Sequence, residues 1–363
     1  MPELFIGLMS GTSLDGIDAV IADFSGERPR LAGHHHDAFP ELLRVELAAL
    51  NDSGVDELNR GARAANALAQ CYAQSVTALL KNAAVDGAEV AAIGCHGQTV
   101  RHQPAAGYTI QLGNPALLAE LTRITVVSDF RSRDVAAGGE GAPLVPAFHA
   151  AVFAARNVHR AVVNIGGIAN VTDLPPTGAV TGFDCGPGNL LLDAWTQKHL
   201  QQPFDRDGEW ARTGHPIPGL FNRLISDEYF RLRPPKSTGR EKFNLAWLLP
   251  HLIGAEKAAD VQATLVEFTA HCAANAIVKF CSGTEAVYLC GGGARNAALV
   301  EAVRRMLNPR EVGVTDALGV DAEQVEALAF AWLARQTLHG EPGNIPAVTG
   351  ATGPRVLGAI YRA

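Results

Sequence analysis

The chain has 363 residues, of which 47% are hydrophobic and 18% are charged, so it is long and apolar enough to form two domains with buried cores. This composition excludes an intrinsically disordered, collagen-like or coiled-coil protein. The formal net charge is −7, which argues against a general affinity for nucleic acid or anionic membranes, so local basic groups must hold any anionic substrate.

The cysteines and the first residues indicate the compartment. Six cysteines are scattered along the chain without a C-x-x-C motif, and several lie in apolar runs. Buried and reduced thiols are therefore expected. Residues 1–11 carry no basic segment, and no apolar run approaches the roughly 18 residues of a membrane span. We predict a cytoplasmic protein without a signal peptide or a membrane partner.

The chain opens with an apolar strand at residues 5–9, a glycine- and hydroxyl-rich turn, and a second strand at residues 17–22. A small turn of this kind leaves backbone N–H groups free to face an anion. Gly11 and Gly16 have Walker A spacing, but Ile17 and Asp18 stand where that motif requires Lys and Ser or Thr. We therefore predict a β-hairpin phosphate loop, and an ordinary tight hairpin is the alternative.

Strand and helix patterns alternate along the rest of the chain, which predicts an α/β fold. Helices are expected at residues 42–50, 55–80, 115–121, 144–155, 297–306 and 325–338, and strands at 90–94, 109–112, 124–128, 161–165, 169–174 and 286–289. Consecutive histidines point in different directions, so His34, His35 and His36 are expected in a surface turn. Residues 231–242 are expected in an exposed loop.

The strand–glycine turn–strand pattern of the first hairpin occurs a second time. Gly166 and Gly167 separate the strands expected at residues 161–165 and 169–174, about 155 residues after the first hairpin. This repeat predicts a duplicated architecture of mixed sheets with a cleft between its halves. Three further glycines, Gly291, Gly292 and Gly293, follow another strand and precede a helix.

Asp184 is the best catalytic candidate. It lies in a segment rich in glycine, which we expect to form a turn that lets a carboxylate approach a phosphate or a sugar closely. Its alternative role is to cap the helix that begins near residue 189. His96 and Gln98 also follow a strand and can bind sugar hydroxyls, and a purely structural histidine is the alternative.

The sequence resembles a known family, the anhydro-N-acetylmuramic acid kinases of the actin/Hsp70/hexokinase superfamily. Eight segments spread over nearly the whole chain carry the resemblance. They are GLMSGTSLDGID (7–18), IGCHGQTVRH (93–102), QLGNPALLAELT (111–122), SDFRSRDVAAGGEGAPLVPAFH (128–149), NIGGIANV (164–171), GFDCGPGN (182–189), PKSTGREKFN (235–244) and CGGGARN (290–296).

The resemblance implies a two-domain kinase that binds ATP in an interdomain cleft. One lobe would comprise residues 1–130 and 345–363, and the other residues 131–344. The nucleotide would be bound by residues of the first hairpin, the second phosphate loop and the triple glycine: Gly11, Thr12, Ser13, Leu14, Asp15, Gly16, Ile17, Asp18, Gly166, Gly167, Gly291, Gly292 and Gly293. Mg²⁺ would accompany ATP, held by Asp184 or Asp18, because Met9 stands where related superfamily members usually carry an aspartate.

The resemblance also implies the substrate, 1,6-anhydro-N-acetylmuramic acid, and the products, N-acetylmuramic acid 6-phosphate and ADP, with one water consumed in cell-wall recycling. Asp184 would be the general base that delivers this water to C1, and Glu326 would help to position the water. Glu326 also fits the simpler role of a carboxylate near a helix N-terminus. Arg131 would bind the lactyl carboxylate. His96, Gln98 and Glu140 would complete the sugar site, and a homodimer is one possible assembly.

Two other functions stay open from the residues alone. A plain hydroxyl kinase for an ordinary amino sugar would use Asp184 to deprotonate a free 6-hydroxyl group. A non-enzymatic ATP-binding module would act through domain motion, as actin- or Hsp70-like proteins do. Sugar-dependent release of ADP would separate a kinase from such a module.

Overall fold

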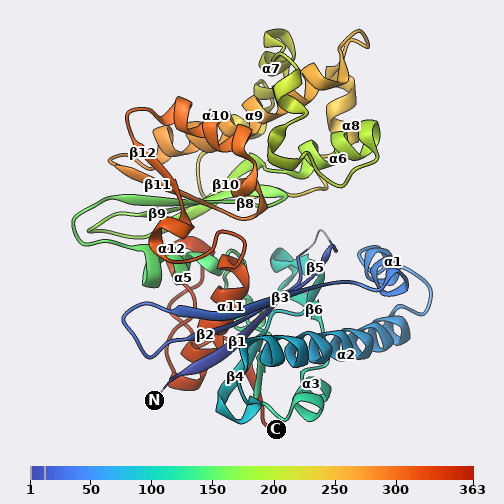
Figure 1. Cartoon of the computed structure of the whole chain (residues 1–363), viewed down its shortest axis with the longest axis vertical. Helices are drawn as coiled ribbons and strands as arrows, with labels where there is room; N and C mark the ends of the chain where they lie inside the picture. Colours follow the sequence, from blue (N-terminus) through green and yellow to red (C-terminus); the bar gives the residue numbers. More distant parts are fainter. Residues whose placement is uncertain (1, 12–13) are drawn as a thin grey trace. The chain divides into compact units, whose positions relative to one another are not determined.

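The computed structural model describes residues 2–11 and 14–363, so the predicted nucleotide contacts of Thr12 and Ser13 lie outside the described residues. The chain divides into two compact units (Figure 1). Unit 1 comprises Met1–Val152 and Gln324–Ala363, and unit 2 comprises Phe153–Glu323. Each unit is built on one mixed β-sheet.

The sheet of unit 1 has the strand order β13-β7-β4-β1-β2-β3. Its strands are β1 (Leu4–Met9), β2 (Gly16–Asp23), β3 (Arg30–Ala38), β4 (Val90–Cys95), β7 (Val126–Ser128) and β13 (Ala359–Tyr361). β1, β2 and β3 form an antiparallel meander, whereas β4 and then β7 continue the sheet parallel to β1. A separate two-stranded sheet contains β5 (Gln98–Gln103) and β6 (Tyr108–Leu112).

The sheet of unit 2 repeats this topology. Its order is β10-β9-β8-β11-β12. The strands are β8 (Arg160–Ile165), β9 (Ile168–Leu174), β10 (Thr181–Pro187), β11 (Ala286–Cys290) and β12 (Glu311–Val314). β8, β9 and β10 form the antiparallel meander, and β11 and β12 extend the sheet parallel to β8. The predicted duplication of a mixed-sheet core is therefore confirmed.

Helices pack on the sheets of both units. Unit 1 contains α1 (Glu41–Ala49), α2 (Glu57–Ala83), α3 (Pro115–Thr122), α4 (Ser132–Ala136), α5 (Val145–Phe153), α11 (Val325–His339) and α12 (Pro346–Thr349). Unit 2 contains α6 (Leu190–Leu200), α7 (Pro218–Ile225), α8 (Leu245–Leu248), α9 (Ala258–Phe280) and α10 (Ala297–Leu307). Among the described residues, no helix combines the length and hydropathy that a membrane crossing requires.

The two faces of β1 contact different helices. Ile6 and Leu8 belong to the core cluster that includes α2 residues such as Tyr72. Gly7 points to the opposite face, because successive strand residues alternate between faces. A Cβ atom at Gly7 would lie 1.9 Å from the carbonyl oxygen of Ala327, so glycine is required where α11 crosses the strand.

This packing explains why the boundaries of the units differ from the predicted lobes. The predicted division placed residues 131–152 and 324–344 in the second lobe, but they belong to unit 1. Helix α11 packs on β1 and on β4, where a Cβ atom at Gly94 would lie 2.0 Å from the carbonyl oxygen of Phe330. The sequence pattern showed an apolar helix here but not the sheet that it covers.

Two further expectations were wrong or incomplete. His34, His35 and His36 lie in β3 rather than in a turn, because β3 is an edge strand whose residues alternate between exposed and half-buried and so tolerates polar side chains. The 23-residue helix α9 was not expected, although it is the most extensively buried helix of unit 2. Its apolar residues surround the whole helix, which hides the amphipathic period.

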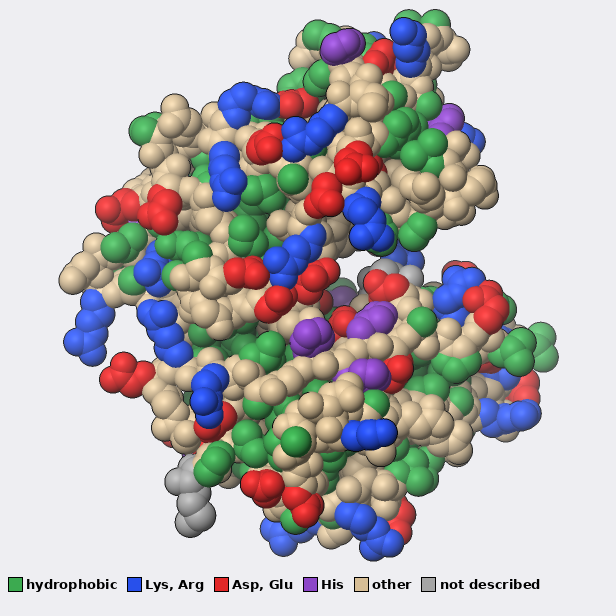
Figure 2. Space-filling view, viewed as in Figure 1, with side chains coloured by type: hydrophobic (Ala, Val, Ile, Leu, Met, Phe, Trp, Pro, Cys, Tyr) green, Lys and Arg blue, Asp and Glu red, His purple; other side chains and the backbone are tan. Residues whose placement is uncertain are grey.

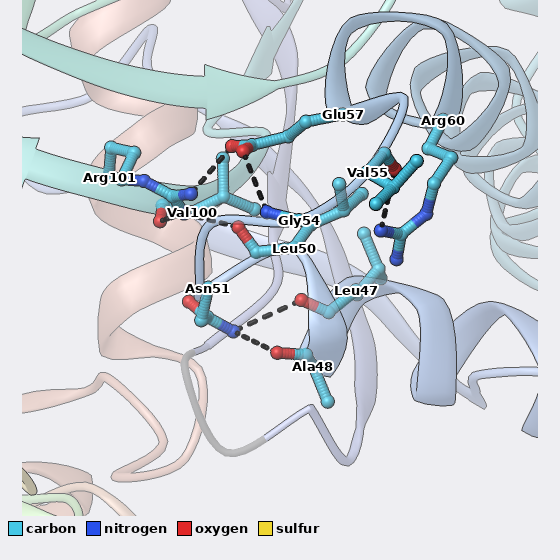
Figure 3. A network of polar contacts seen from close by, with 10 residues as sticks. All are labelled: Leu47, Ala48, Leu50, Asn51, Gly54, Val55, Glu57, Arg60, Val100 and Arg101. Carbon is cyan, nitrogen blue, oxygen red and sulfur yellow. Dashed lines mark hydrogen bonds and ion pairs between the residues drawn. The ribbon is translucent and has the colours of Figure 1, made fainter.

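The loop between α1 and α2 is anchored to β5 (Figure 3). Arg101 donates hydrogen bonds to the carbonyls of Leu50 and Val100 and forms an ion pair with Glu57 at 2.5 Å. Glu57 in turn accepts from the N–H of Gly54 at 3.3 Å.

On the surface drawn in Figure 2, basic and acidic side chains are interspersed, so no single sign dominates the part of this face that the structure describes.

Candidate active site

The predicted first phosphate hairpin is the turn that joins β1 to β2. Met9 pairs with Asp18 at the last position of the antiparallel register, which confirms the predicted β-hairpin. Leu14 has a φ of 59°, and its N–H donates to the carbonyl of Gly11 at 3.2 Å, which tightens the turn. Leu14 and Ile17 are buried, so only their backbone groups can face a phosphate.

Buried side chains hold this hairpin from outside. The hydroxyl of Ser10 bonds to the hydroxyl of Tyr72 at 2.8 Å and donates to the carbonyl of Gly97 at 3.2 Å. Gln98 donates from Nε2 to the carbonyl of Gly11 at 3.1 Å, and its Oε1 makes no hydrogen bond within the described residues. Gln98, predicted to bind substrate, therefore stabilises the hairpin through its amide N–H. Its buried Oε1 has no hydrogen-bond partner among the described residues.

The strand β3 borders the hairpin on its other side. A Cβ atom at Gly16 would lie 2.3 Å from the carbonyl oxygen of Asp37, so a glycine is required there. His36 Nδ1 lies 2.8 Å from Asp18 Oδ1 in an exposed pair. Asp18, a predicted ligand of phosphate or metal, is thus hydrogen-bonded to a residue of the misassigned histidine run. Asp15 accepts a hydrogen bond from the N–H of Gly16 at 3.0 Å.

Arg131 and His96 form the second part of the site in unit 1. Arg131 donates to His96 Nε2 from Nε at 3.2 Å and from Nη2 at 2.9 Å, and to the carbonyl of Gly141 from Nη1 at 2.7 Å. Burial and, to a smaller extent, the charge of Arg131 lower the pKa of His96 to about 3. Burial also lowers the pKa of Arg131 to about 10, so the guanidinium stays charged at neutral pH.

The remaining predicted residues of unit 1 differ in their surroundings. Glu326 lies in the first turn of α11, and its charge raises the pKa of Arg131, so the two groups share one neighbourhood. Glu140 is exposed, and its backbone N–H donates to the carbonyl of Thr349 at 2.7 Å. The structure therefore brings Arg131, His96 and Glu326 together and leaves the side chain of Glu140 on the surface.

In unit 2, Asp184 lies inside β10 and not in the predicted turn. It pairs with Asn170 of β9, and the pairing continues to Pro187 after a β-bulge between Asp184 and Gly186. The glycines of this segment do not end the strand, because the bulge absorbs the extra residue and lets the ladder continue. Asp184 therefore lies at a bulge, a place where strands commonly redirect side chains.

The carboxyl group of Asp184 is in an environment suited to a general base. Its Oδ2 accepts from the N–H of Thr238 at 3.0 Å. Burial raises the pKa of Asp184 to about 6, whereas this hydrogen bond and the charge of Lys236 oppose the shift, and the charge of Glu241 adds to it. A carboxylate with this pKa is ionised at neutral pH and is more basic than an exposed aspartate.

The segment that we expected as an exposed loop forms part of this environment. Lys236 is half-buried, its ammonium lies 4.4 Å from the ring centroid of Tyr229, and its carbonyl accepts from the N–H of Asp184. Tyr229 donates its hydroxyl proton to the carbonyl of Asp184 at 2.8 Å. The sequence reasoning missed the roles of Lys236 and Thr238, although both lie in a segment that carried the family resemblance.

The predicted second phosphate loop, at Gly166 and Gly167, packs against the end of β10. The N–H of Gly188 donates to the carbonyl of Gly167 at 2.9 Å, and the N–H of Asn189 donates to the carbonyl of Gly166 at 2.8 Å. Asn189 also donates from Nδ2 to the carbonyl of Ile165 at 3.2 Å. Asn189, which the sequence reasoning noted only as a helix start, therefore links the loop to α6.

The glycines around this loop fall into two classes. Gly291 has a φ of 78°, and a Cβ atom there would lie 2.3 Å from Asn164 Oδ1, so the chain itself requires glycine. The same is true of Gly293, whose Cβ would lie 2.3 Å from the side chain of Ile165. At Gly166 and Gly167 the nearest described atoms would be 3.7 and 4.0 Å away, so the described residues do not require glycine there.

No group of three or more His, Cys, Asp or Glu side chains in the described ranges could hold a metal ion. Protein sites for nucleotide-bound Mg²⁺ often supply only one or two carboxylates. Asp18 and Asp184 are single carboxylates of this kind, one in each unit. Their assignment to the metal stays a prediction.

Comparison with known proteins identifies one protein family over nearly the whole chain. A family model described as anhydro-N-acetylmuramic acid kinase matches residues 3–363. A protein of that name from Nitrosospira multiformis is 57% identical over 361 residues, which cover 99% of both chains. Another from Pseudomonas savastanoi pv. phaseolicola is 52% identical over the full length of both.

Solved structures are more distant. An activator of 2-hydroxyisocaproyl-CoA dehydratase from Clostridium difficile is 14% identical and has a TM-score of 0.49, with 91% of this chain and 93% of that chain covered. At this level the likeness supports no statement about function.

Proposed function

Because the chain belongs to the anhydro-N-acetylmuramic acid kinase family, we propose that it opens 1,6-anhydro-N-acetylmuramic acid with water and phosphorylates O6 at the expense of ATP. The observation that carries this proposal is the family match over residues 3–363. The products are N-acetylmuramic acid 6-phosphate and ADP, and the reaction belongs to the recycling of cell-wall sugars. A cytoplasmic location fits the use of ATP and the six free cysteines.

The chemistry couples two bond changes. The 1,6-anhydro bridge leaves O6 without a proton, so O6 becomes a nucleophile only when its bond to C1 breaks. Water attacks C1, its proton passes to a base, the C1–O6 bond breaks, and O6 takes the γ-phosphoryl group as ADP leaves. In ordinary glycoside cleavage an acid protonates the leaving oxygen. Here the phosphoryl group takes the place of that proton.

Asp184 is the group that fits the base. Its pKa of about 6 means that it is ionised at neutral pH and still basic enough to accept a proton from the attacking water. The N–H of Thr238 fixes one carboxylate oxygen. Glu326 is assigned to orienting the water.

The sugar is assigned to residues of unit 1. The Arg131 guanidinium has five N–H groups, of which three bond to His96 and Gly141. The other two N–H groups can pair with the lactyl carboxylate of the substrate. Gln98 offers its buried Oε1 to a hydroxyl, and Glu140 is assigned to the edge of the site.

ATP is assigned to the first phosphate hairpin, between β1 and β2, and to the second phosphate loop at Gly166 and Gly167. Gly167 is exposed, and glycine at this position leaves backbone N–H groups open to a phosphate. Bound Mg²⁺ would neutralise charge on the phosphates, and Asp184 and Asp18 are the residues that would hold it. A plain hydroxyl kinase is the second candidate, since Asp184 can also deprotonate a free 6-hydroxyl group.

Isotopic labelling tests the proposal and separates the two kinases. The reaction is run in ¹⁸O-labelled water and stopped before the anomeric hydroxyl exchanges. We expect label at C1 of the sugar phosphate and none in ADP, with C1 attacked from the face opposite O6. An unlabelled early product would favour the hydroxyl kinase. Label in inorganic phosphate would indicate an uncoupled ATPase.

A further inference from the structure

Asp134 is a fully buried carboxylate of α4 that no step of the proposed reaction uses. Its Oδ1 accepts from Asn344 Nδ2 at 2.6 Å and from the hydroxyl of Thr349 at 2.8 Å. Its Oδ2 accepts from the backbone N–H of Gly141 at 2.8 Å. A buried carboxylate is stable only when hydrogen bonds compensate for its lost hydration, and these three bonds do so.

The bonds of Asp134 lead directly to Arg131. Gly141 donates its N–H to Asp134 and accepts through its carbonyl from Arg131 Nη1 at 2.7 Å. The peptide groups on both sides of Gly141 are thus fixed at once, one by a buried carboxylate and the other by the guanidinium. A Cβ atom at Gly139 would lie 2.2 Å from Asp134 Oδ2, so the loop closes tightly around this carboxylate.

The donors to Asp134 come from a remote part of the chain. Asn344 precedes α12 and Thr349 ends it, whereas Asp134 lies 210 and 215 positions earlier in the sequence. The same segment accepts the N–H of Glu140 through the carbonyl of Thr349. The segment at residues 344–349 therefore fixes the loop at residues 138–141 through both side-chain and backbone bonds.

We propose that Asp134, Asn344 and Thr349 are positioning residues that set the orientation of Arg131 and thereby the preference of the enzyme for a sugar that carries a carboxylate. This inference rests on the proposed function, in which Arg131 binds the lactyl group. Asp134 does not touch substrate. It acts because a guanidinium pairs well with a carboxylate only when its plane is correctly aimed.

The test compares two ligands of the full chain by calorimetry without ATP: 1,6-anhydro-N-acetylmuramic acid and its lactyl primary amide. The amide has the same shape but no charge. The main variant is Thr349→Val, which removes one hydroxyl at nearly constant volume. Thr349→Ser restores the hydroxyl, and Asn344→Ala removes the other donor independently. Thr352→Val is the matched control, because Thr352 is exposed three positions after Thr349 and its hydroxyl accepts a hydrogen bond from Arg355 Nη2.

We expect wild type to prefer the acid, and Thr349→Val and Asn344→Ala to weaken binding of the acid about fivefold or more with the amide within twofold. Thr349→Ser and Thr352→Val should keep the wild-type preference. Equal weakening of both ligands would reveal a general structural role and overturn the inference. Equal affinity of wild type for both ligands would also overturn it and leave the kinase standing. Failure of wild type to bind the acid would overturn the proposed function together with this inference.

Discussion

Arg131 donates two hydrogen bonds to the same atom, Nε2 of His96, at 3.2 and 2.9 Å. An imidazole nitrogen that accepts hydrogen bonds carries no proton, so His96 is neutral and protonated at Nδ1. Its pKa of about 3 keeps it neutral over the whole physiological range. The histidine therefore fixes the plane of the guanidinium without adding a second positive charge beside the expected carboxylate.

This geometry predicts the effect of Arg131→Lys. A lysine keeps the charge, but it cannot bond to His96 and Gly141 and still present two parallel donors. The KM for the anhydro sugar should rise about tenfold or more, with the KM for ATP within twofold. Steady-state kinetics measure both values. Arg133→Lys is the control, because Arg133 is exposed in α4, which begins directly after Arg131, and an equal effect of both variants would contradict a specific role.

Asp184→Asn tests the general base. Asparagine keeps the size and can still accept a hydrogen bond from Thr238, but it cannot take a proton. Turnover should fall roughly a hundredfold or more, while the affinity for ATP changes little. The control is Asp207→Asn, an exposed position of unit 2. Near-normal turnover of the purified Asp184 variant would remove this residue from the mechanism.

The environment of Asp184 also predicts a pH profile. The active form is the carboxylate, and burial raises its pKa to about 6. Above pH 6 the carboxylate dominates, and below it kcat/KM should fall about tenfold per pH unit as the group is protonated. A profile of kcat/KM between pH 5 and 8 shows the position of this acid limb. A profile that stays flat down to pH 5, as the pKa near 4 of an exposed aspartate would give, would contradict the buried environment.

The two classes of glycine predict opposite effects of the same substitution. Gly167→Ala adds a methyl group where no described atom lies closer than 4.0 Å, so the melting temperature should change little. Its KM for ATP should nevertheless rise about tenfold, because the methyl group occupies space that a phosphate needs. Gly291→Ala, by contrast, places a methyl group 2.3 Å from Asn164 Oδ1 and should lower the melting temperature.

A matched control exists for the glycine series. Gly319 has a φ of 87° in unit 2, but no described atom lies within 4 Å of a Cβ atom built there. Gly319→Ala therefore isolates the cost of backbone strain from that of the clash, and it should destabilise less than Gly291→Ala. An unchanged KM for ATP in Gly167→Ala would speak against the second phosphate loop.

The parts of the fold that the sequence predicted well are those with a clear period and a clear turn. The hairpin around Gly11 and its repeat around Gly166 are examples, because glycine turns separate short apolar strands in both. Strand β3 was missed because its histidines alternate between exposed and half-buried without contributing an apolar period. Helix α9 was missed for the opposite reason, since residues on nearly every side of it are buried.

The site shows a similar division. Asp184 was found because a carboxylate among glycines is an unusual local pattern. The supporting groups could not be found this way, because their partners are distant in sequence: Thr238 lies 54 positions from Asp184, and Thr349 lies 215 positions from Asp134. A pattern within one segment cannot reveal a bond that only the folded chain creates.

The crossing of α11 over Gly7 has a consequence for biosynthesis. Unit 1 contains both early and late parts of the chain, whereas unit 2 is one continuous segment. On the ribosome, β1 and β4 emerge long before the helix that covers them, and domains fold as units as they appear. Unit 2 can therefore complete its core first, while one face of the sheet of unit 1 stays exposed until α11 is synthesised. A nascent chain stalled before Val325 should expose that face to chaperones, and release of α11 should end their binding.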